Sequence, residues 1–165
     1  MAKMTVTGLD AFEAKMNRLA NGGTVGAAKM AVYDGAAVVT DKIRDNLENL
    51  PTVRDVDAIA AYRKGTFAGI TGRQKAGLLD SLGVAPMQVT SAEINARIGF
   101  DGYNEVKTKR WPNGQPNSMI ARSIESGTSF MQKHPFLRPA VNSSRSQAQE
   151  KMQETFEKRI EELGG

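Results

Sequence analysis

The sequence predicts an α+β fold in which a small antiparallel sheet is packed by two long helices. Apolar residues recur at the helical period over residues 25–50 and again from Phe136 to Leu163. Between these segments, residues 83–100 alternate in character, which is typical of strands. The length of 165 residues fits one domain, here residues 1–165, that can bury a core without disulfides.

The N-terminal segment predicts a short strand and a short helix. Met4–Leu9 alternates and is β-branched, which favours a strand at a sheet edge. Asp10 is a good helix N-cap, and Glu13 stands where a capping-box partner would lie. We therefore expect a helix over 10–20, ended by the following Asn-Gly-Gly.

The sequence predicts a long helix over residues 25–50 in the N-terminal half of the chain. Its apolar face begins with small residues and continues with larger ones. The residues of this face are Ala28, Val32, Ala36, Val39, Ile43, Leu47 and Leu50. Pro51 ends the helix or starts a turn.

The middle of the chain predicts two short helices and a hairpin. Residues 57–63 are compatible with a short helix, and 71–82 reads as a capped helix. Residues 83–89 and 91–100 are the expected strands, made antiparallel by a turn near Thr90.

Residues 103–117 predict an exposed loop that carries a basic cluster. Lys107, Lys109, Arg110 and Trp111 place three cations beside an aromatic side chain. Contact with a nucleic-acid backbone together with base stacking is one function of such a cluster. A solvated loop is the favoured alternative, with Trp111 packed on the body of the protein or anchoring a partner subunit.

The residue types argue against catalysis, metal binding and bound cofactors. The chain has no Cys, and its single His134 lies before a proline, without a nucleophile motif. The glycines do not match a phosphate-binding loop, and Asp55 and Asp57 supply too few oxygens for Ca²⁺. We therefore predict that the protein is not an enzyme.

Charge and hydropathy bear on partners and location. The net charge of +4 permits contact with nucleic acid but does not establish it. No apolar run is long enough to span a bilayer, and the N-terminus lacks the apolar region of a signal peptide. We expect a protein that is cytosolic when synthesised and has no membrane partner.

The most specific segment runs from a short helix at 119–126 to the start of the C-terminal helix. Gly127 releases the chain from the short helix, and Thr128 can bond nearby backbone. Pro135 and Pro139 bracket a tight corner that Phe136 and Leu137 would plug into the core. The stripe of the long helix that follows is Phe136, Ala140, Ser144, Ala148, Met152, Phe156, Ile160 and Leu163.

This segment resembles the tail-completion or head–tail joining proteins of long-tailed lambdoid-type phages. That family carries a Glu-x-Gly-Thr element, matched here by Glu125, Gly127 and Thr128. It then carries Pro-Phe-Leu-x-Pro-Ala at the start of a long C-terminal helix. The matching residues are Pro135, Phe136, Leu137, Pro139 and Ala140.

A mid-chain element of the same family is similar as well. Its Thr-Gly-x-Leu-x-x-Ser-Ile pattern is approached by Thr71, Gly72, Ser81 and Leu82, with extra residues after Gly72. The resemblance covers most of the chain in the same order, but residues 52–70 and 103–117 are longer than the family pattern. The matched positions are carried over as determinants of fold and interface, since the family has no catalytic residues to transfer.

The resemblance implies a structural subunit of the virion neck, assembled in the host cytoplasm. Such a subunit would complete the tail end and join it to the DNA-filled head. Its expected partners are copies of itself, in a ring that the resemblance implies to be six-fold, and the head-closure, tail-terminator and tail-tube proteins. The subunit would lie close to genomic DNA. A tail-terminator or head-closure ring protein is the alternative of the same class, and a DNA-binding protein that uses Lys107–Trp111 is the alternative of another class.

Overall fold

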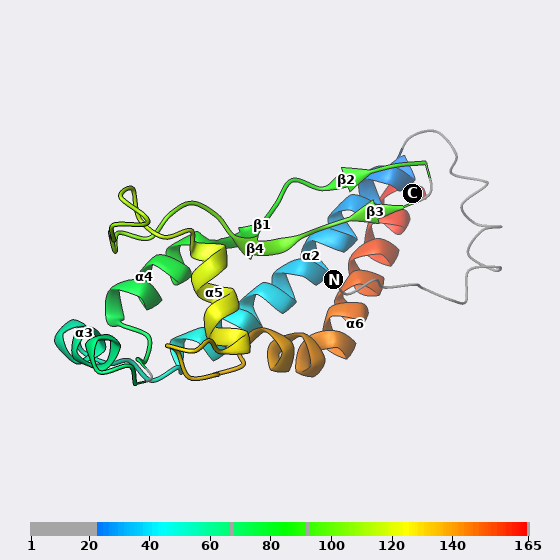
Figure 1. Ribbon diagram of the computed structural model, residues 1–165. Coiled ribbons are helices and arrows are strands. Elements are labelled where there is room, and N and C mark those ends of the chain that lie inside the picture. The colour runs from blue at the N-terminus through cyan, green and yellow to red at the C-terminus, as the bar shows by residue number, and fades with distance from the viewer. Residues whose placement is uncertain (1–22, 67, 92, 165) are drawn as a thin grey trace.

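A computed structural model describes residues 23–66, 68–91 and 93–164, and the strand and helix expected before residue 21 lie outside these ranges. The described chain is α+β, as predicted (Figure 1). Its elements are α2 (Gly23–Glu48), α3 (Asp55–Arg63), α4 (Gly72–Ser81), β1 (Leu82–Val84), β2 (Gln88–Val89), β3 (Ile94–Asn95), β4 (Ile98–Phe100), α5 (Asn117–Ser126) and α6 (Leu137–Gly164).

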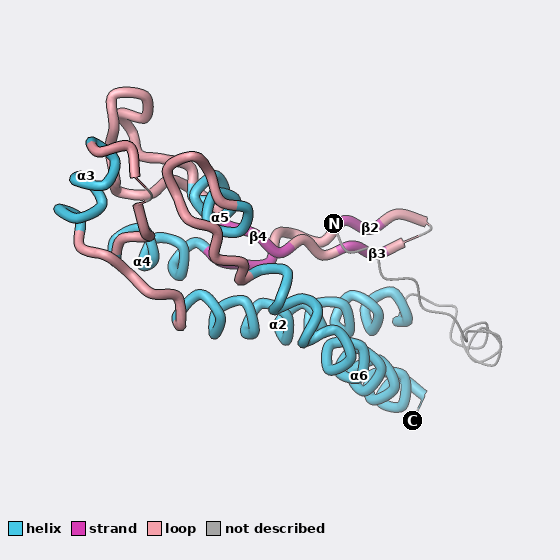
Figure 2. Tube along the Cα trace, turned by 60° about the horizontal axis from the view of Figure 1, so that its bottom comes forward, coloured by secondary structure: helices cyan, strands magenta, loops and turns pink. Residues whose placement is uncertain are grey.

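The two long helices pack against each other in antiparallel orientation (Figures 1 and 2). Near the start of α2, a Cβ atom added at Gly23 would lie 2.8 Å from Leu163 Cδ1. Further along, a Cβ atom at Gly35 would lie 2.4 Å from Met152 Cγ. The small residues of α2 therefore let the larger side chains of α6 approach the helix backbone.

The buried face of α2 differs from the predicted face in its first half. Ala27 and Ala31 are buried, whereas Ala28 and Val32 are only half-buried. Periodicity alone cannot decide between neighbouring small residues, and here α6 selects the ones that allow the closest approach. From Ala36 onward, the buried residues coincide with the predicted face at Ala36, Ile43 and Leu47.

The predicted hairpin is present, but each of its strands is interrupted. β1 pairs with β4, and β2 pairs with β3, so two short ladders replace one continuous ladder. The register shifts by one residue between the two ladders, because residues 85–87 lie opposite residues 96 and 97 alone, and Pro86 lies in this bulge. The turn expected near Thr90 is closed by its N–H, which donates to the Glu93 carbonyl at 2.9 Å.

The main core lies where the C-terminal half of α2 meets α4, α5 and the start of α6. Its fully buried members are Leu47, Leu78, Ile124, Phe136 and Ala140. A second, smaller cluster joins the start of α2 to the end of α6, through Ala27, Ala31, Phe156 and Ile160. In the described part of the chain, no helix is long and apolar enough to cross a membrane.

Candidate functional site

The segment between α5 and α6 forms a corner that begins at Gly127. This glycine has φ of 73°, and its N–H donates to the Ser123 carbonyl at 2.8 Å. A side chain here would adopt a strained backbone conformation, and its Cβ would lie 3.0 Å from Lys133 Cβ. Glycine at this position therefore lets α5 end and the chain turn back on itself.

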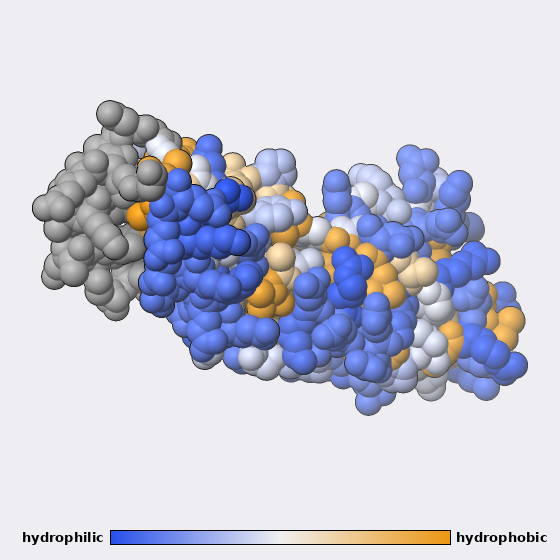
Figure 3. Space-filling view, turned by 180° about the vertical axis from the view of Figure 1, so that it is seen from behind, coloured by the Kyte–Doolittle hydropathy of each residue, from blue (hydrophilic) through white to orange (hydrophobic). Residues whose placement is uncertain are grey.

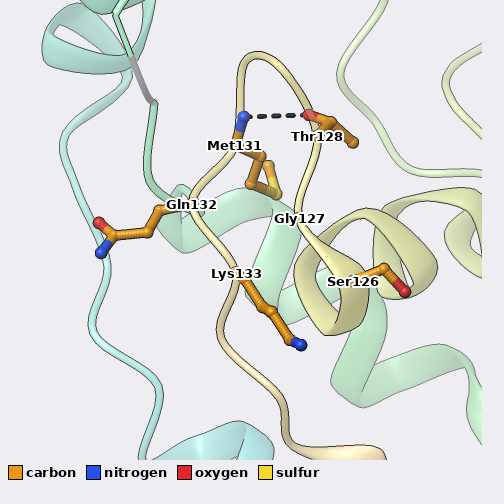
Figure 4. Close-up of a pocket in the computed structure, with 6 residues that line it drawn as sticks. All are labelled: Ser126, Gly127, Thr128, Met131, Gln132 and Lys133. Carbon is orange, nitrogen blue, oxygen red and sulfur yellow. Dashed lines mark hydrogen bonds between the residues drawn. The ribbon is translucent and has the colours of Figure 1, made fainter.

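Thr128 closes the turn that follows. Its hydroxyl accepts hydrogen bonds from the N–H groups of Phe130 at 3.2 Å and Met131 at 3.0 Å, the latter drawn in Figure 4. Its own N–H donates to the Met131 carbonyl at 2.9 Å. The Ala68 N–H donates to the Phe130 carbonyl at 2.7 Å, which joins this turn to the segment before α4.

The Glu125 carboxylate caps the N-terminus of α6 from outside that helix. Its Oε2 atom accepts from the N–H groups of Phe136 at 2.7 Å and Leu137 at 2.8 Å, and its Oε1 atom accepts from Arg138 at 3.0 Å. The next residue, Pro139, has no N–H, and the Ala140 N–H already donates within the helix to the Phe136 carbonyl. Every backbone donor of the first turn is therefore satisfied, and a negative charge lies at the positive end of the helix dipole.

Phe136 anchors the corner in the core, as the sequence predicts. Its side chain is 1% exposed and lies edge-on to Phe100 of β4, with ring centroids 6.1 Å apart. Its carbonyl also accepts a hydrogen bond from Asn46 Nδ2 of α2 at 3.0 Å. Burial of a side chain of this size stabilises the fold by about 1.5–3 kcal/mol.

The other corner residues divide between core and surface. Ala140 is fully buried, and Leu137 is half-buried against the main core. Pro135 and Pro139 are exposed, so they act through the backbone and not through burial. The corner thus brings both C-terminal motif elements into one hydrogen-bonded unit.

Two shallow hollows flank the corner, with volumes of 390 and 440 Å³. Figure 4 shows the first, where the Gln132 and Lys133 side chains point in different directions. The second is lined in part by Glu125, whose oxygens already accept three backbone N–H groups. Its lining also includes the polar side chains of Lys133, Arg138 and Asn142.

The mid-chain motif residues belong to α4. Thr71 and Gln74 form a reciprocal capping box at its start, with the Gln74 N–H 3.3 Å from the Thr71 hydroxyl. Gly72 is exposed in open space, and the Ser81 hydroxyl donates to the Leu78 carbonyl at the end of the helix. These residues determine where α4 begins and ends, which agrees with the helix predicted over 71–82.

The prediction that 103–117 is an exposed loop is correct for its tip and wrong for its base. Asn104 is 2% exposed, and Gly114 and Asn117 are buried as well. The Asn104 amide donates to the Gln74 carbonyl at 3.3 Å and to Asn117 Oδ1 at 3.4 Å. Polar residues can be buried at such a place because their partners are supplied by α4 and α5, which local sequence does not reveal.

The tip of this loop carries the predicted basic cluster. Thr108 and Trp111 exchange two backbone hydrogen bonds, of 3.1 and 3.0 Å, that close a tight turn. Lys107, Lys109 and Arg110 are exposed on this turn, and Trp111 is half-buried. The tip is remote from the corner because α5, ten residues or roughly 15 Å long, separates the two.

The helix α3 has an unusual surface, since none of its residues is buried. Val56, Ile59 and Tyr62 are each more than half exposed, and the Tyr62 ring lies 5.3 Å from the ring of exposed Phe130. We call these four residues the α3 patch. Hydrophobic surface reaches this end of the molecule in Figure 3, whereas α6 presents a largely hydrophilic face.

The carboxylates at the start of α3 are held in ion pairs. Arg54 lies 2.7 Å from Asp57, and Arg73 lies 3.3 Å from Asp55. The hydrogen bond from Arg54, together with its charge, lowers the pKa of Asp57.

His134 is half-buried, and its backbone N–H donates to the Ile124 carbonyl. Among residues 23–66, 68–91 and 93–164, no three His, Cys, Asp or Glu side chains are grouped so that they could hold a metal ion.

No protein-family model, curated protein or solved structure matches this chain. The candidate site therefore consists of three features of the structure: the corner, the basic loop tip and the α3 patch.

Four residues that shape these features were not predicted from the sequence. They are Asn46, Gly77, Asn104 and Asn117. Their only sequence signal is that asparagine and glycine often mark special backbone positions, and this signal is shared by many surface turns.

Proposed function

We propose that this protein is a non-enzymatic structural subunit of a tailed-phage neck. In this role it completes the tail end and joins the tail to the DNA-filled head through ring assembly and contacts with other neck and tail proteins. The observation that carries the proposal is the Glu125 cap. The two C-terminal elements of the family resemblance are parts of one unit here, in which Glu125 of the first binds the backbone of the second.

The cap explains why these elements belong together physically. A helix that begins with Pro-Phe-Leu-x-Pro-Ala needs an acceptor for the three N–H groups before its second proline. The Glu-x-Gly-Thr element supplies that acceptor and then turns the chain back at Gly127. Without the first element, backbone N–H groups at the start of α6 would lack an acceptor. Without the second, the Glu125 carboxylate would have no helix to cap. The joint presence of the two elements therefore supports the resemblance better than two separate short matches would.

The α3 patch supports assembly by protein–protein contact. A nine-residue helix that exposes Val56, Ile59 and Tyr62 buries little apolar surface against the rest of the described chain. The start of α2 lies at the opposite end of the elongated molecule (Figure 1). Val25, Met30 and Tyr33, in the first half of this helix, are also exposed. Contacts between unlike surfaces of identical subunits produce rings when the rotation closes.

Charge favours a second copy of this chain as the occupant of the α3 patch. Residues 53–75, around the patch, carry five cations against two carboxylates, a net charge of +3. Residues 149–164, at the other end, carry five carboxylates against three cations, a net charge of −2. Opposite charge at the two ends would steer copies into a head-to-tail arrangement.

The decisive experiment is genetic and structural. In a phage that encodes this chain, deletion of its gene is expected to leave separate filled heads and tails, and a tagged copy is expected to restore joined particles and to purify with them. Electron microscopy of the neck would then locate the subunit. Normal infectious particles from the deletion strain would refute the proposal.

The self-association surface has its own test on the purified protein. Ile59→Asp is expected to weaken association by at least about tenfold in sedimentation experiments, since burial of an isoleucine contributes about 1.5–3 kcal/mol. Ala60→Asp is the matched control, because Ala60 is exposed on the same helix outside the α3 patch. Equal weakening by both substitutions would show that charge alone matters and would refute the patch as the interface.

A further inference from the structure

The loop over residues 103–116 is a rigid support for its basic tip. Tyr103 and Pro116 form an antiparallel bridge at its base, and the Asn104 N–H donates to the Gln115 carbonyl at 2.7 Å. Gly114 has φ of 100°, and a Cβ there would lie 1.8 Å from the Asn104 carbonyl oxygen. The two arms therefore approach more closely than any other residue type at position 114 would allow.

Helices on both sides hold this base in place. Gly77 of α4 leaves room for the Asn104 side chain, since a Cβ at position 77 would lie 2.4 Å from Asn104 Nδ2. The Asn117 side chain, at the start of α5, donates to the Asp101 carbonyl at 2.9 Å. Such a base lowers the entropy that the tip loses when it binds a ligand.

The cations at the tip have no acidic partner among the residues that the structure describes. The four ion pairs of the described chain involve none of Lys107, Lys109 and Arg110. Residues 103–116 contain one carboxylate, Glu105, and these three cations. Three exposed positive charges on a rigid turn, none of them in an ion pair among the described residues, are suited to a polyanion.

The environment of Trp111 argues against base stacking. Its side chain is half-buried, and the Arg110 guanidinium carbon lies 6.0 Å from its ring centroid. The residues from 107 to 110 expose no apolar side chain that could anchor a protein interface. The tip therefore presents positive charge but neither a surface for base stacking nor an apolar anchor. Such a surface is suited to the closely spaced phosphates of a DNA duplex.

We propose that the tip, residues 107–111, binds the phosphate backbone of double-stranded DNA without reading its sequence. Lys107, Lys109 and Arg110 each neutralise one phosphate, and Trp111 holds Arg110 in position. This activity does not depend on the proposed role in the neck, and it can be measured on the purified chain alone.

The proposal predicts the salt dependence of binding. Three phosphate contacts correspond to a slope of about −2.7 in a plot of log affinity against log salt concentration. Affinity for duplex DNA should therefore fall by roughly 500-fold between about 20 and 200 mM salt. A fluorescent duplex of mixed sequence and the full-length protein suffice for the measurement by fluorescence anisotropy.

The variant that tests the tip combines Lys107→Gln, Lys109→Gln and Arg110→Gln. Because it loses three phosphate contacts, the magnitude of its slope of log affinity against log salt concentration should fall by about 2.7. It should therefore bind the duplex only weakly, even at low salt. Its circular dichroism spectrum and unfolding midpoint should match those of the parent protein, because these three side chains are exposed and make no ion pair among the described residues.

The matched control combines Lys64→Gln, Arg145→Gln and Lys158→Gln. These three cations are exposed outside the loop, and their loss changes the net charge by the same amount. The control should retain most of the parent slope. Equal losses in both variants would mean that net charge alone drives binding, and no loss in the tip variant would place the DNA elsewhere; either result overturns the proposal.

A second polyanion separates DNA from an acidic protein partner. Polyglutamate at the same charge concentration should compete for the tip far more weakly than unlabelled duplex. If polyglutamate competes as well as the duplex does, the tip is a general acceptor of acidic chains and the assignment to DNA is overturned.

Discussion

The removal of the Glu125 carboxylate should destabilise the protein more than the loss of any exposed carboxylate. Glu125→Ala leaves the N–H groups of Phe136, Leu137 and Arg138 without their acceptor. Arg138 is exposed, so water can replace the carboxylate there. Phe136 is buried and Leu137 is half-buried, so their N–H groups lose a partner that water replaces poorly.

The magnitude follows from these exposures. An unsatisfied buried donor costs about 1–3 kcal/mol, and the lost charge at the helix N-terminus adds about 0.3–1 kcal/mol. With a partial contribution from Leu137, the free energy of unfolding should fall by about 2–4 kcal/mol. In a chain of this size, the midpoint temperature should fall by roughly 6–12 °C.

The assay is urea and thermal unfolding followed by circular dichroism, with Glu150→Ala as the control. Glu150 is exposed on α6 and makes no side-chain hydrogen bond or ion pair among the described residues, so its loss should change stability by less than about 0.5 kcal/mol. Glu125→Gln keeps an acceptor oxygen but loses the charge, and it should fall between the two. If Glu125→Ala and Glu150→Ala unfold together, the capping argument is wrong.

Three further substitutions test close approaches and a helix cap. Gly35→Val should reduce the unfolding free energy by about 1–3 kcal/mol, because its side chain meets Met152 and forces α2 and α6 apart. Gly114→Ala should cost at least about 1–3 kcal/mol from backbone strain, and amide hydrogen exchange should show lost protection at Asn104. Thr71→Ala should cost about 1 kcal/mol, because it removes one half of the α4 capping box; urea unfolding measures it.

Each of these substitutions has a control at a comparable position. Gly26 lies on α2 with nothing within 4 Å of an added Cβ, so Gly26→Val should be much milder than the substitution at Gly35. Gly102 has φ of 65° in open space, so Gly102→Ala measures strain without the clash at Gly114. Thr52→Ala, at an exposed position, is the control for Thr71→Ala. If a substitution and its control change the unfolding free energy equally, the reasoning for that position is refuted.

Some of the described chain could be read from local sequence because local interactions decide it. The period of α2 and α6, the Thr71 cap and the turn near Thr90 depend on residues within a few positions of each other. The corner was predicted for the same reason, since Gly127 and the prolines restrict their own backbone. Pro86 could have warned that the hairpin ladder would be interrupted, but alternation concealed the gap.

Other features depend on residues that lie far apart in the sequence. Asn104 is buried because Gly77 leaves space for it and because Gln74 and Asn117 supply its hydrogen-bond partners. The buried face of α2 shifts to Ala27 and Ala31 because α6 packs there. These outcomes depend on which elements meet, and no local pattern contains that information.

The Glu125 corner combines both kinds of information. Local sequence is enough to predict that the short helix ends at Gly127, that Pro139 suits the first turn of a helix, and that Phe136 plugs the corner into the core. It does not predict that the Glu125 carboxylate accepts the three N–H groups at the start of α6. Backbone restrictions act within a residue or two, whereas the partner of an unpaired backbone donor is whichever acceptor the fold brings within about 3 Å.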